Sequence, residues 1–174
     1  MTTTTSATTT GSTTTGSTTT GSTAVRIDAV PWTHDDAAAL RGQMTAELRP
    51  RYADLVRSRG PFPESDPATV VVTLVAYAGD VPVGTAALRL VDGLHEVKRV
   101  YVAPEHRRDG LAARLLAALE ERARTLGVRT LVLQTGVRQP EAVALYTREG
   151  WLPVRQFGQY VDDPFSLCFA KDLA

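Results

Sequence analysis

The stretch "VYVAPEHRRDGLAARLL", Val100–Leu116, joins a β-branched run to a run rich in alanine and leucine. The first run is typical of a strand and the second of a helix. The helix would begin near Gly110, where about four backbone N–H groups lack partners and the positive end of the helix dipole lies. Two interpretations follow. Either the loop binds an anion such as a phosphate, with added charge from Arg107 and Arg108, or both arginines are solvated and the glycine only eases the turn.

The hydrophobic periodicity on both sides of this stretch predicts one sheet flanked by helices. Two β-branched runs around "AGDV" and a second turn at Asp92–Gly93 indicate an antiparallel meander of three strands. The helix after Gly110 leads to another buried strand, and such a crossover is parallel and right-handed. The fold class is therefore α/β, an α+β mixed sheet that is mostly antiparallel. The predicted strands are 25–30, 70–77, 82–90, 94–102, 129–136, 151–154 and 165–173, and the predicted helices are 33–48, 52–58, 110–126 and 139–149.

Composition separates a tail from a single domain. Residues 1–24 are rich in threonine, glycine and serine and contain "TTTGS" three times in tandem, so they have almost no apolar surface to bury. We predict a disordered tail over 1–24 and one domain over 25–174. Basic and acidic residues number 19 each, and this balance argues against a nucleic-acid partner.

Cysteine content and apolar run length bear on location. The chain has one cysteine, Cys168, and so no internal disulfide, which favours a reducing cytoplasm. No apolar stretch approaches the roughly 20 residues of a membrane span, and the first residues lack the regions of a signal peptide. We therefore expect a cytoplasmic protein with no membrane partner. We also expect no metal, because no cluster of histidine, cysteine and carboxylates has metal-ligand spacing.

Two motifs resemble those of a known family, the GCN5-related N-acetyltransferases (GNAT family). The acyl-CoA binding pattern of that family, Val-x-Pro and then Arg/Gln-x-x-Gly-x-Gly/Ala, falls on Val102, Pro104, Arg107, Gly110 and Ala112. Further on, "EAVALYTREGW" is similar to the family's Ala-x-x-Leu-Tyr-x-x-x-Gly-Phe segment, on Ala142, Leu145, Tyr146, Gly150 and Trp151. The resemblance covers about residues 25–172. It implies a GNAT-like acyl-CoA N-acyltransferase fold and acetyl-CoA (coenzyme A) as cosubstrate.

The resemblance also implies roles for individual residues. The loop backbone would wrap the pyrophosphate of coenzyme A, at Arg107, Arg108, Asp109, Gly110, Leu111 and Ala112. The strand backbone would pair with the pantetheine arm, at Val100, Tyr101 and Val102. Tyr146 would stand near the thioester sulfur and protonate the leaving thiolate. Gln139 stands where the family often has asparagine, and it would supply an amide contact to the cofactor arm.

The implied reaction moves an acetyl group from a thioester to an amine, and some group must remove a proton from the ammonium form. Several family members carry a catalytic glutamate eleven residues before the motif's Arg/Gln, which points to Glu96. Strand alternation would put Glu96 on one face with Lys98, Val100 and Val102, where a carboxylate at the floor of a cleft could have a raised pKa. The alternative is that Glu96 pairs with an arginine or Lys98 and only orders water or orients substrate. For Tyr146 the alternative is a tyrosine packed against the sheet.

The family usually builds its acceptor pocket from two segments. Here these are Thr33–Ala68 and "RQFGQYVDDPF", which contains Phe157, Tyr160, Asp162 and Asp163. Aromatic walls with carboxylates attract an ammonium group, although the same residues suit a solvated turn with Asx hydrogen bonds.

Three arginines in the first acceptor segment, Arg51, Arg57 and Arg59, would favour an acceptor that also bears a carboxylate. The function predicted is an N-acetyltransferase that acts on a primary amine of a small molecule, or on a protein amine, by direct attack in a ternary complex. The protein would be a monomer or homodimer. The alternative is a non-catalytic sensor or interaction module that binds acyl-CoA.

Overall fold

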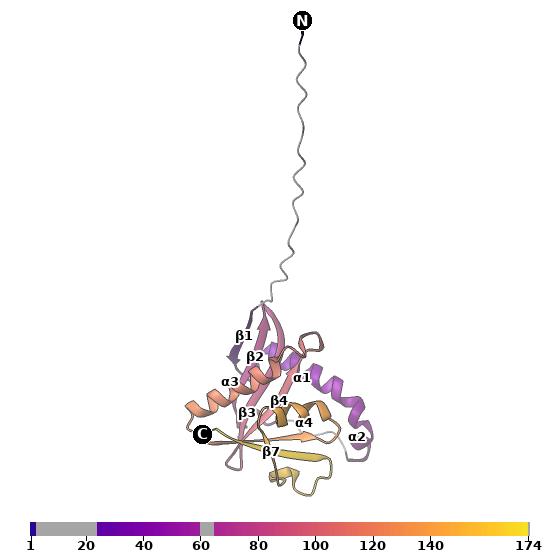
Figure 1. Ribbon diagram of the computed structural model, residues 1–174. Helices are drawn as coiled ribbons and strands as arrows, with labels where there is room; N and C mark the ends of the chain where they lie inside the picture. The colour runs from indigo at the N-terminus through magenta and orange to yellow at the C-terminus, as the bar shows by residue number, and fades with distance from the viewer. Residues whose placement is uncertain (3–23, 60–64, 174) are drawn as a thin grey trace.

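The computed structural model describes residues 1–2, 24–59 and 65–173, so the predicted tail falls almost entirely outside it. A seven-stranded sheet of order β1-β2-β3-β4-β5-β7-β6 forms the centre of the domain (Figure 1). Each neighbouring pair of strands is antiparallel except β4 and β5, which are parallel. The predicted fold class, a mixed and mostly antiparallel sheet with one parallel crossover, is therefore confirmed.

The elements lie close to their predicted positions and in the predicted order. The strands are β1 (Val25–Val30), β2 (Val70–Ala78), β3 (Val81–Val91), β4 (Leu94–Val102), β5 (Thr130–Gly136), β6 (Leu152–Val154) and β7 (Ser166–Asp172). The α-helices are α1 (Asp35–Leu48), α2 (Ala53–Arg59), α3 (Leu111–Thr125) and α4 (Pro140–Arg148). Short 3₁₀ turns are η1 (Arg49–Tyr52), η2 (Pro67–Thr69), η3 (Pro104–His106) and η4 (Gly158–Tyr160).

Two tight turns set the register of the β2–β3–β4 meander. Gly79 opens the first turn with φ 61°, a value that a glycine adopts without steric penalty. Asp92 and Gly93 form the second turn with φ 51° and 76°, as the hairpin turns that match strand twist require. These turns fix which side chains of the three strands lie opposite one another.

Strand β4 contains a bulge that the alternation of its sequence does not reveal. Tyr101 pairs with Thr85 of β3, and Lys98 pairs with Ala87, so β4 holds one residue more than β3 between the two pairs. Arg99 lies in this interval with φ 57°, in the left-handed region. An extra residue in one strand bends it and shifts its side-chain alternation.

The bulge makes the predicted alternation of β4 wrong beyond Lys98. Glu96 and Lys98 flank Val97, which packs in the cluster under α3, so both point to the opposite face of the sheet. Val100 and Val102 pack against that same α3 cluster. The prediction had placed these valines on the face of Glu96, and the extra residue at the bulge is what separates them.

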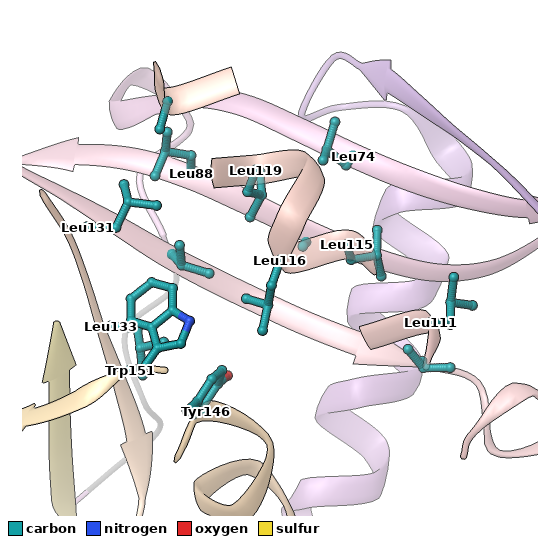
Figure 2. Packing of buried hydrophobic residues seen from close by; sticks show 14 of the residues in the cluster. Leu74, Leu88, Leu111, Leu115, Leu116, Leu119, Leu131, Leu133, Tyr146 and Trp151 are labelled. Carbon is teal, nitrogen blue, oxygen red and sulfur yellow. The ribbon is translucent and has the colours of Figure 1, made fainter. Parts of the chain in front are cut away.

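Leucines of α3 fill one face of the sheet. They recur at helical spacing, and α4 and the residue after its C-terminal turn add two large aromatic side chains to the same cluster (Figure 2). The cluster includes Leu74, Leu88, Leu111, Leu115, Leu116, Leu119, Leu131, Leu133, Tyr146 and Trp151. Most of the apolar burial of the domain lies here.

Helix α1 covers the opposite face with smaller side chains. Only Ala37 and Leu40 of α1 are buried, and they pack against Val75, Tyr77 and Tyr101 of the strands. The helix therefore contacts the sheet along a narrow stripe. The polar network around Glu96 lies on this less densely packed face.

Candidate active site

The loop from β4 to α3 presents backbone donors at the edge of the sheet. Gly110 stands at the N-cap of α3 with φ 74° and has no side chain with which to cap the helix. The first hydrogen bond of the helix joins the Arg114 amide to the Gly110 carbonyl at 3.1 Å, so the amides of Leu111, Ala112 and Ala113 precede it. A Cβ built on Gly110 would meet no atom within 4 Å. An anion therefore has room beside N–H groups that the helix does not use.

The two arginines of this loop differ in what they contact. Arg107 donates to both carboxylate oxygens of Glu47, at 3.1 and 2.6 Å, and its Nε donates to the Val102 carbonyl at 2.8 Å. The hydrogen bonds to Glu47 raise the pKa of Arg107 further. Arg108 is exposed and lies in the left-handed region at φ 71°, and Asp109 beside it is also exposed. The Arg107 side chain thus ties the loop to α1, and Arg108 carries the exposed positive charge.

Strands β4 and β5 diverge close to this loop. Their described pairing ends at Val97 and Leu133. Just beyond it, Lys98 Nζ lies 3.5 Å from Gln134 Oε1, and the following β4 residues 100–102 have no described pairing with β5. An unpaired strand edge offers N–H and C=O groups to an extended ligand. The predicted pantetheine-binding segment therefore lies along a free edge.

Tyr146 of α4 packs at the border of the leucine cluster. Its ring lies beside that of Trp151 (Figure 2), with 6.2 Å between the ring centres. The centre of the Phe169 ring lies 6.0 Å away. Burial raises the pKa of Tyr146 well above its usual value. The hydroxyl has no hydrogen bond to another described residue. The Tyr146 ring is thus packed against the sheet, as one interpretation predicted. Its hydroxyl stays protonated and makes no hydrogen bond to the described residues, so it can act as a donor to a ligand.

Gln139 precedes α4 and contacts another part of the chain. Its Nε2 donates to the Tyr52 hydroxyl at 3.2 Å. Its neighbour Arg138 donates to both carboxylate oxygens of Asp54, at 2.6 and 2.9 Å, and this pairing lowers the pKa of Asp54 to about 2. The segment from η1 to α2 is therefore fastened to the start of α4. Gln139 is part of that contact.

Glu96 is buried in a network of hydrogen bonds, on the face away from α3. Arg89 of β3 binds its Oε2 through Nε at 2.7 Å and through a terminal nitrogen at 2.6 Å. The Tyr160 hydroxyl donates to its Oε1 at 2.8 Å, and Lys98 Nζ lies 3.4 Å from the same oxygen. The Glu96 side chain is 3% exposed and that of Arg89 9%. The structure therefore shows the pairing named as the alternative in the sequence analysis, with both an arginine and Lys98.

Burial sets the protonation of the groups around Glu96. It raises the pKa of the Tyr160 hydroxyl, and the negative charge of Glu96 raises it further, so Tyr160 stays a donor. Burial lowers the pKa of Lys98 in spite of the attraction of Glu96. Lys98 Nζ also lies 2.8 Å from the Tyr160 oxygen. Lys98, Tyr160 and Glu96 thus form a continuous chain that reaches the gap between β4 and β5.

The sequence did not point to Arg89, and it predicted a role for Tyr160 in the acceptor pocket rather than as a partner of Glu96. Arg89 interrupts an apolar run of β3, and a charge inside such a run is a signal for a buried partner. Tyr160 was predicted as an aromatic wall, and its ring does pack against Phe157 at 5.4 Å with the planes perpendicular. Its hydroxyl, however, points to Glu96 across a long sequence separation, which local patterns do not encode.

The two carboxylates of the last loop behave as turn residues where the structure describes their bonds. Asp163 accepts from the Phe165 amide at 3.3 Å and from the Ser166 hydroxyl at 2.6 Å. Asp162 is exposed with φ 61°. These contacts match the Asx turn that was the second interpretation of this loop.

The arginines predicted to make the first acceptor segment basic are not gathered at one place. Arg51 pairs with Glu141 and donates to the Arg138 carbonyl at 3.2 Å. Arg57 is exposed on α2, and the side chain of Arg59 lies outside the described part of the structure. Three other arginines line a cavity on the α1 face of the sheet, at Arg41, Arg49 and Arg99.

Within residues 1–2, 24–59 and 65–173, no group of three or more histidine, cysteine, aspartate or glutamate residues is placed to hold a metal ion. In the same ranges, no helix has the length and apolar character needed to cross a bilayer.

The sheet, its parallel crossover and the open helix start together define the class of the acyl-CoA N-acyltransferases. The model of the acetyltransferase (GNAT) family matches residues 36–151. The chain belongs to this family and is an acetyltransferase. The resemblance seen in the sequence is confirmed.

Individual relatives agree with this assignment. An "IAA acetyltransferase" of Azospirillum brasilense is 39% identical over 102 residues, which are 58% of this chain and 67% of the relative. A Klebsiella pneumoniae protein assigned as an acyl-CoA N-acyltransferase superposes with a TM-score of 0.70 at 34% identity, covering 86% of this chain and 98% of its own. A GNAT family acetyltransferase of Elizabethkingia anophelis, solved with acetyl-CoA bound, shares the fold at 15% identity and a TM-score of 0.61, covering 85% and 97%.

Proposed function

We propose that this acetyltransferase takes the acetyl group of acetyl-CoA and transfers it to a primary amine of a small molecule by direct attack in a ternary complex. Family membership supports the transfer of an acetyl group. The observation that carries the choice of donor is the open helix start at Gly110, which offers N–H groups and empty space to a phosphate. The acetyl-CoA held by the Elizabethkingia neighbour of the same fold is consistent with that choice.

The donor would lie along two features that adjoin each other. The amides of Leu111, Ala112 and Ala113, with the charge of Arg108, would hold the pyrophosphate. The free β4 edge at 100–102 would pair with the pantetheine arm as an added strand does. Acetyl-CoA then supplies an activated thioester at the gap between β4 and β5.

The transfer requires the removal of one proton from the amine and the delivery of one proton to the leaving thiolate. A lysine-like amine has a pKa near 10.4 and is mostly protonated at neutral pH, so it must lose a proton before its nitrogen can attack. A backbone N–H of β4 near Val102 would stabilise the negative oxygen that develops. Tyr146 would give its proton to the departing thiolate, and its raised pKa keeps that proton in place over the working pH range.

Glu96 would act through its neighbours. Because Arg89 and Tyr160 hold both carboxylate oxygens, the amine proton would have to reach Glu96 through Lys98 and Tyr160 or through water. We therefore propose that the amine releases its proton to water at the gap between the strands, and that Glu96 mainly positions Tyr160 and Lys98 there.

The competing function is a module that binds acyl-CoA without catalysis. The Tyr146 hydroxyl in α4 makes no hydrogen bond to a described residue. This favours the enzyme, because a protein that only binds acyl-CoA does not need a proton donor at this position. Thiol release with a panel of primary amines separates the two. Coenzyme A binding without turnover on any amine would select the sensor.

The helix start provides the direct test of donor binding. Gly110→Trp places a side chain in the open space, and we expect coenzyme A affinity to fall about a hundredfold or more as charge-assisted hydrogen bonds are lost. Gly127→Trp is the matched control: Gly127 follows α3, has the same φ of 74° and equally open surroundings. Calorimetry with coenzyme A should find normal affinity in the control, and equal affinity in both variants would refute the donor site.

A further inference from the structure

Lys98 places its amino group at the closed end of the gap between β4 and β5. The described pairing of the two strands ends at Val97 and Leu133. At the next position of each strand, Lys98 Nζ lies 3.5 Å from Gln134 Oε1, so the side chain spans the point where the strands separate. The proposed donor edge, residues 100–102, follows along β4. The Lys98 amine therefore lies at the end of the gap that the donor would occupy.

The donor would bring its thioester to this point. Its pyrophosphate would lie at the start of α3, and its pantetheine arm would run back along β4 from Val102 to Val100, toward Lys98. Tyr146 belongs to the leucine cluster on the α3 face (Figure 2), whereas Lys98 points to the opposite face of the sheet. A thioester in the gap would thus have an amine on one side and a proton donor on the other.

The amino group of Lys98 is held by neighbours from other parts of the chain. Its Nζ lies 2.8 Å from the Tyr160 oxygen and 3.4 Å from Glu96 Oε1. The Lys98 side chain is 18% exposed. Arg89 binds the other oxygen of Glu96, so two basic side chains share this carboxylate. An amine that is already fixed in position loses little freedom when it reacts with a bound partner.

Burial also makes Lys98 a better nucleophile than an exposed lysine. It lowers the pKa of the Lys98 amine, although Glu96 attracts its charge. A larger fraction of the amine is therefore unprotonated near neutral pH, and only that form attacks a carbonyl carbon. The chain has one other lysine, Lys171. Lys171 of β7 pairs with Glu120 of α3 at 2.7 Å, on the opposite face of the sheet.

We propose that the protein acetylates its own Lys98. This inference rests on the donor binding of the proposed function, and it needs no acceptor amine. The unprotonated Lys98 nitrogen attacks the thioester carbon and forms a C–N bond, and the C–S bond breaks with its electron pair on the sulfur. Tyr146 protonates the thiolate and is reprotonated from water, and the nitrogen releases one proton to water. The products are coenzyme A and an uncharged amide at Lys98.

Mass spectrometry of the unchanged protein tests this directly, because Lys98 and Lys171 are its only lysines. The protein is incubated with acetyl-CoA and no amine, then digested and mapped. We expect Lys98 to be acetylated at least about a hundredfold faster than Lys171, because the amine and the bound thioester react within one complex. The rate constant should not depend on protein concentration. Equal labelling of both lysines, no labelling of Lys98, or a rate constant that rises with protein concentration would overturn the inference.

Variants then tie the labelling to the donor site. Lys98→Arg keeps the charge and should lose the acetyl group from its intact mass, whereas Lys171→Arg, the matched control, should gain it at the unchanged rate. Gly110→Trp should lower the labelling rate at limiting acetyl-CoA about tenfold or more as donor affinity falls. Undiminished labelling of Lys98 in a Gly110→Trp protein that no longer binds coenzyme A would assign the reaction to free acetyl-CoA and refute the inference.

Two outcomes separate this inference from the proposed function. Transfer to added amines without any acetylation of Lys98 would refute self-acetylation and leave the proposed function intact. Acetylation of Lys98 without transfer to any amine would support self-acetylation and refute the small-molecule acceptor.

Discussion

The two faces of the central sheet are built in different ways. On the α3 face, leucines of a long amphipathic helix pack against leucines and valines of the strands and enclose Trp151 (Figure 2). On the other face, α1 buries only Ala37 and Leu40, and the remaining space holds an arginine-lined cavity and the network around Glu96. One face is stabilised by apolar volume, and the other by the pairing of charges.

The two faces of one sheet therefore depend on different interactions for their stability. Strand β4 contributes to both faces, since Val97 enters the leucine cluster while its neighbours Glu96 and Lys98 enter the polar network. The bulge at Arg99 then turns the strand so that its valines return to the apolar side. Substitutions on the α3 face should therefore lower stability by removing apolar volume, and those on the other face by removing the partner of a buried polar group.

The largest effect is expected where a buried charge loses its partner. Glu96→Met leaves Arg89 buried without its carboxylate, and removing one partner of such a pair lowers the free energy of unfolding by about 3–5 kcal/mol. The double variant Arg89→Met, Glu96→Met removes both charges and should recover most of that loss. Urea unfolding of the three proteins measures the difference. A double variant no more stable than the single one would show that Glu96 does not act through this pair.

A cavity on the apolar face should come next. Leu119→Ala deletes a fully buried side chain of α3 and should lower the free energy of unfolding by about 2–5 kcal/mol, with kcat unchanged in the folded protein. Met44→Ala on α1 is the counterpart, because Met44 is only partly buried against the smaller cluster. We expect it to lose less than half as much. Equal losses would contradict the contrast drawn between the two faces.

The sequence was sufficient for the meander, the crossover and the helix start, because each depends on local signals. The turns at Gly79 and at Asp92–Gly93 require positive φ angles, which glycine and aspartate adopt more readily than most residues. The leucines of α3 recur at helical spacing. It was not sufficient for the bulge at Arg99. No residue type marks an added position in a strand, so the alternation of β4 was extended one residue too far.

The polar groups were harder to foresee for a related reason. Arg89, Glu96 and Tyr160 come from a strand, its neighbour and a distant 3₁₀ turn, and only the folded sheet brings them together. The cavity on the α1 face likewise joins Trp32, which lies ahead of α1, to Arg99 of the β4 bulge. The position of Glu96 could be inferred from a motif, whereas its partners could not.

A pair of tyrosines on opposite faces separates catalysis from stability. Tyr146→Phe removes a hydroxyl without a described hydrogen bond, so stability should change by no more than about 0.5 kcal/mol, while kcat should fall about a hundredfold if the thiolate is protonated there. Tyr77→Phe should do the reverse. It loses the 2.8 Å bond from its hydroxyl to Asp36, at about 1 kcal/mol of stability, and should keep its turnover. Full activity of Tyr146→Phe would remove Tyr146 from the mechanism.

The smallest expected effect is a pH dependence on the polar face. Burial lowers the pKa of Lys98 in the folded protein, whereas in the unfolded chain it stays near 10.4. Between these two values the unfolded chain binds more protons, so this residue makes the free energy of unfolding rise with pH. Lys98→Met abolishes that contribution. The stability of the variant minus that of the unchanged protein should therefore fall from pH 7 to pH 10, and the titration of Tyr160, common to both, should largely cancel. A difference that stays flat or rises over this range would contradict a lowered pKa of Lys98, and burial would then not outweigh the attraction of Glu96 in the chain from Lys98 through Tyr160 to Glu96.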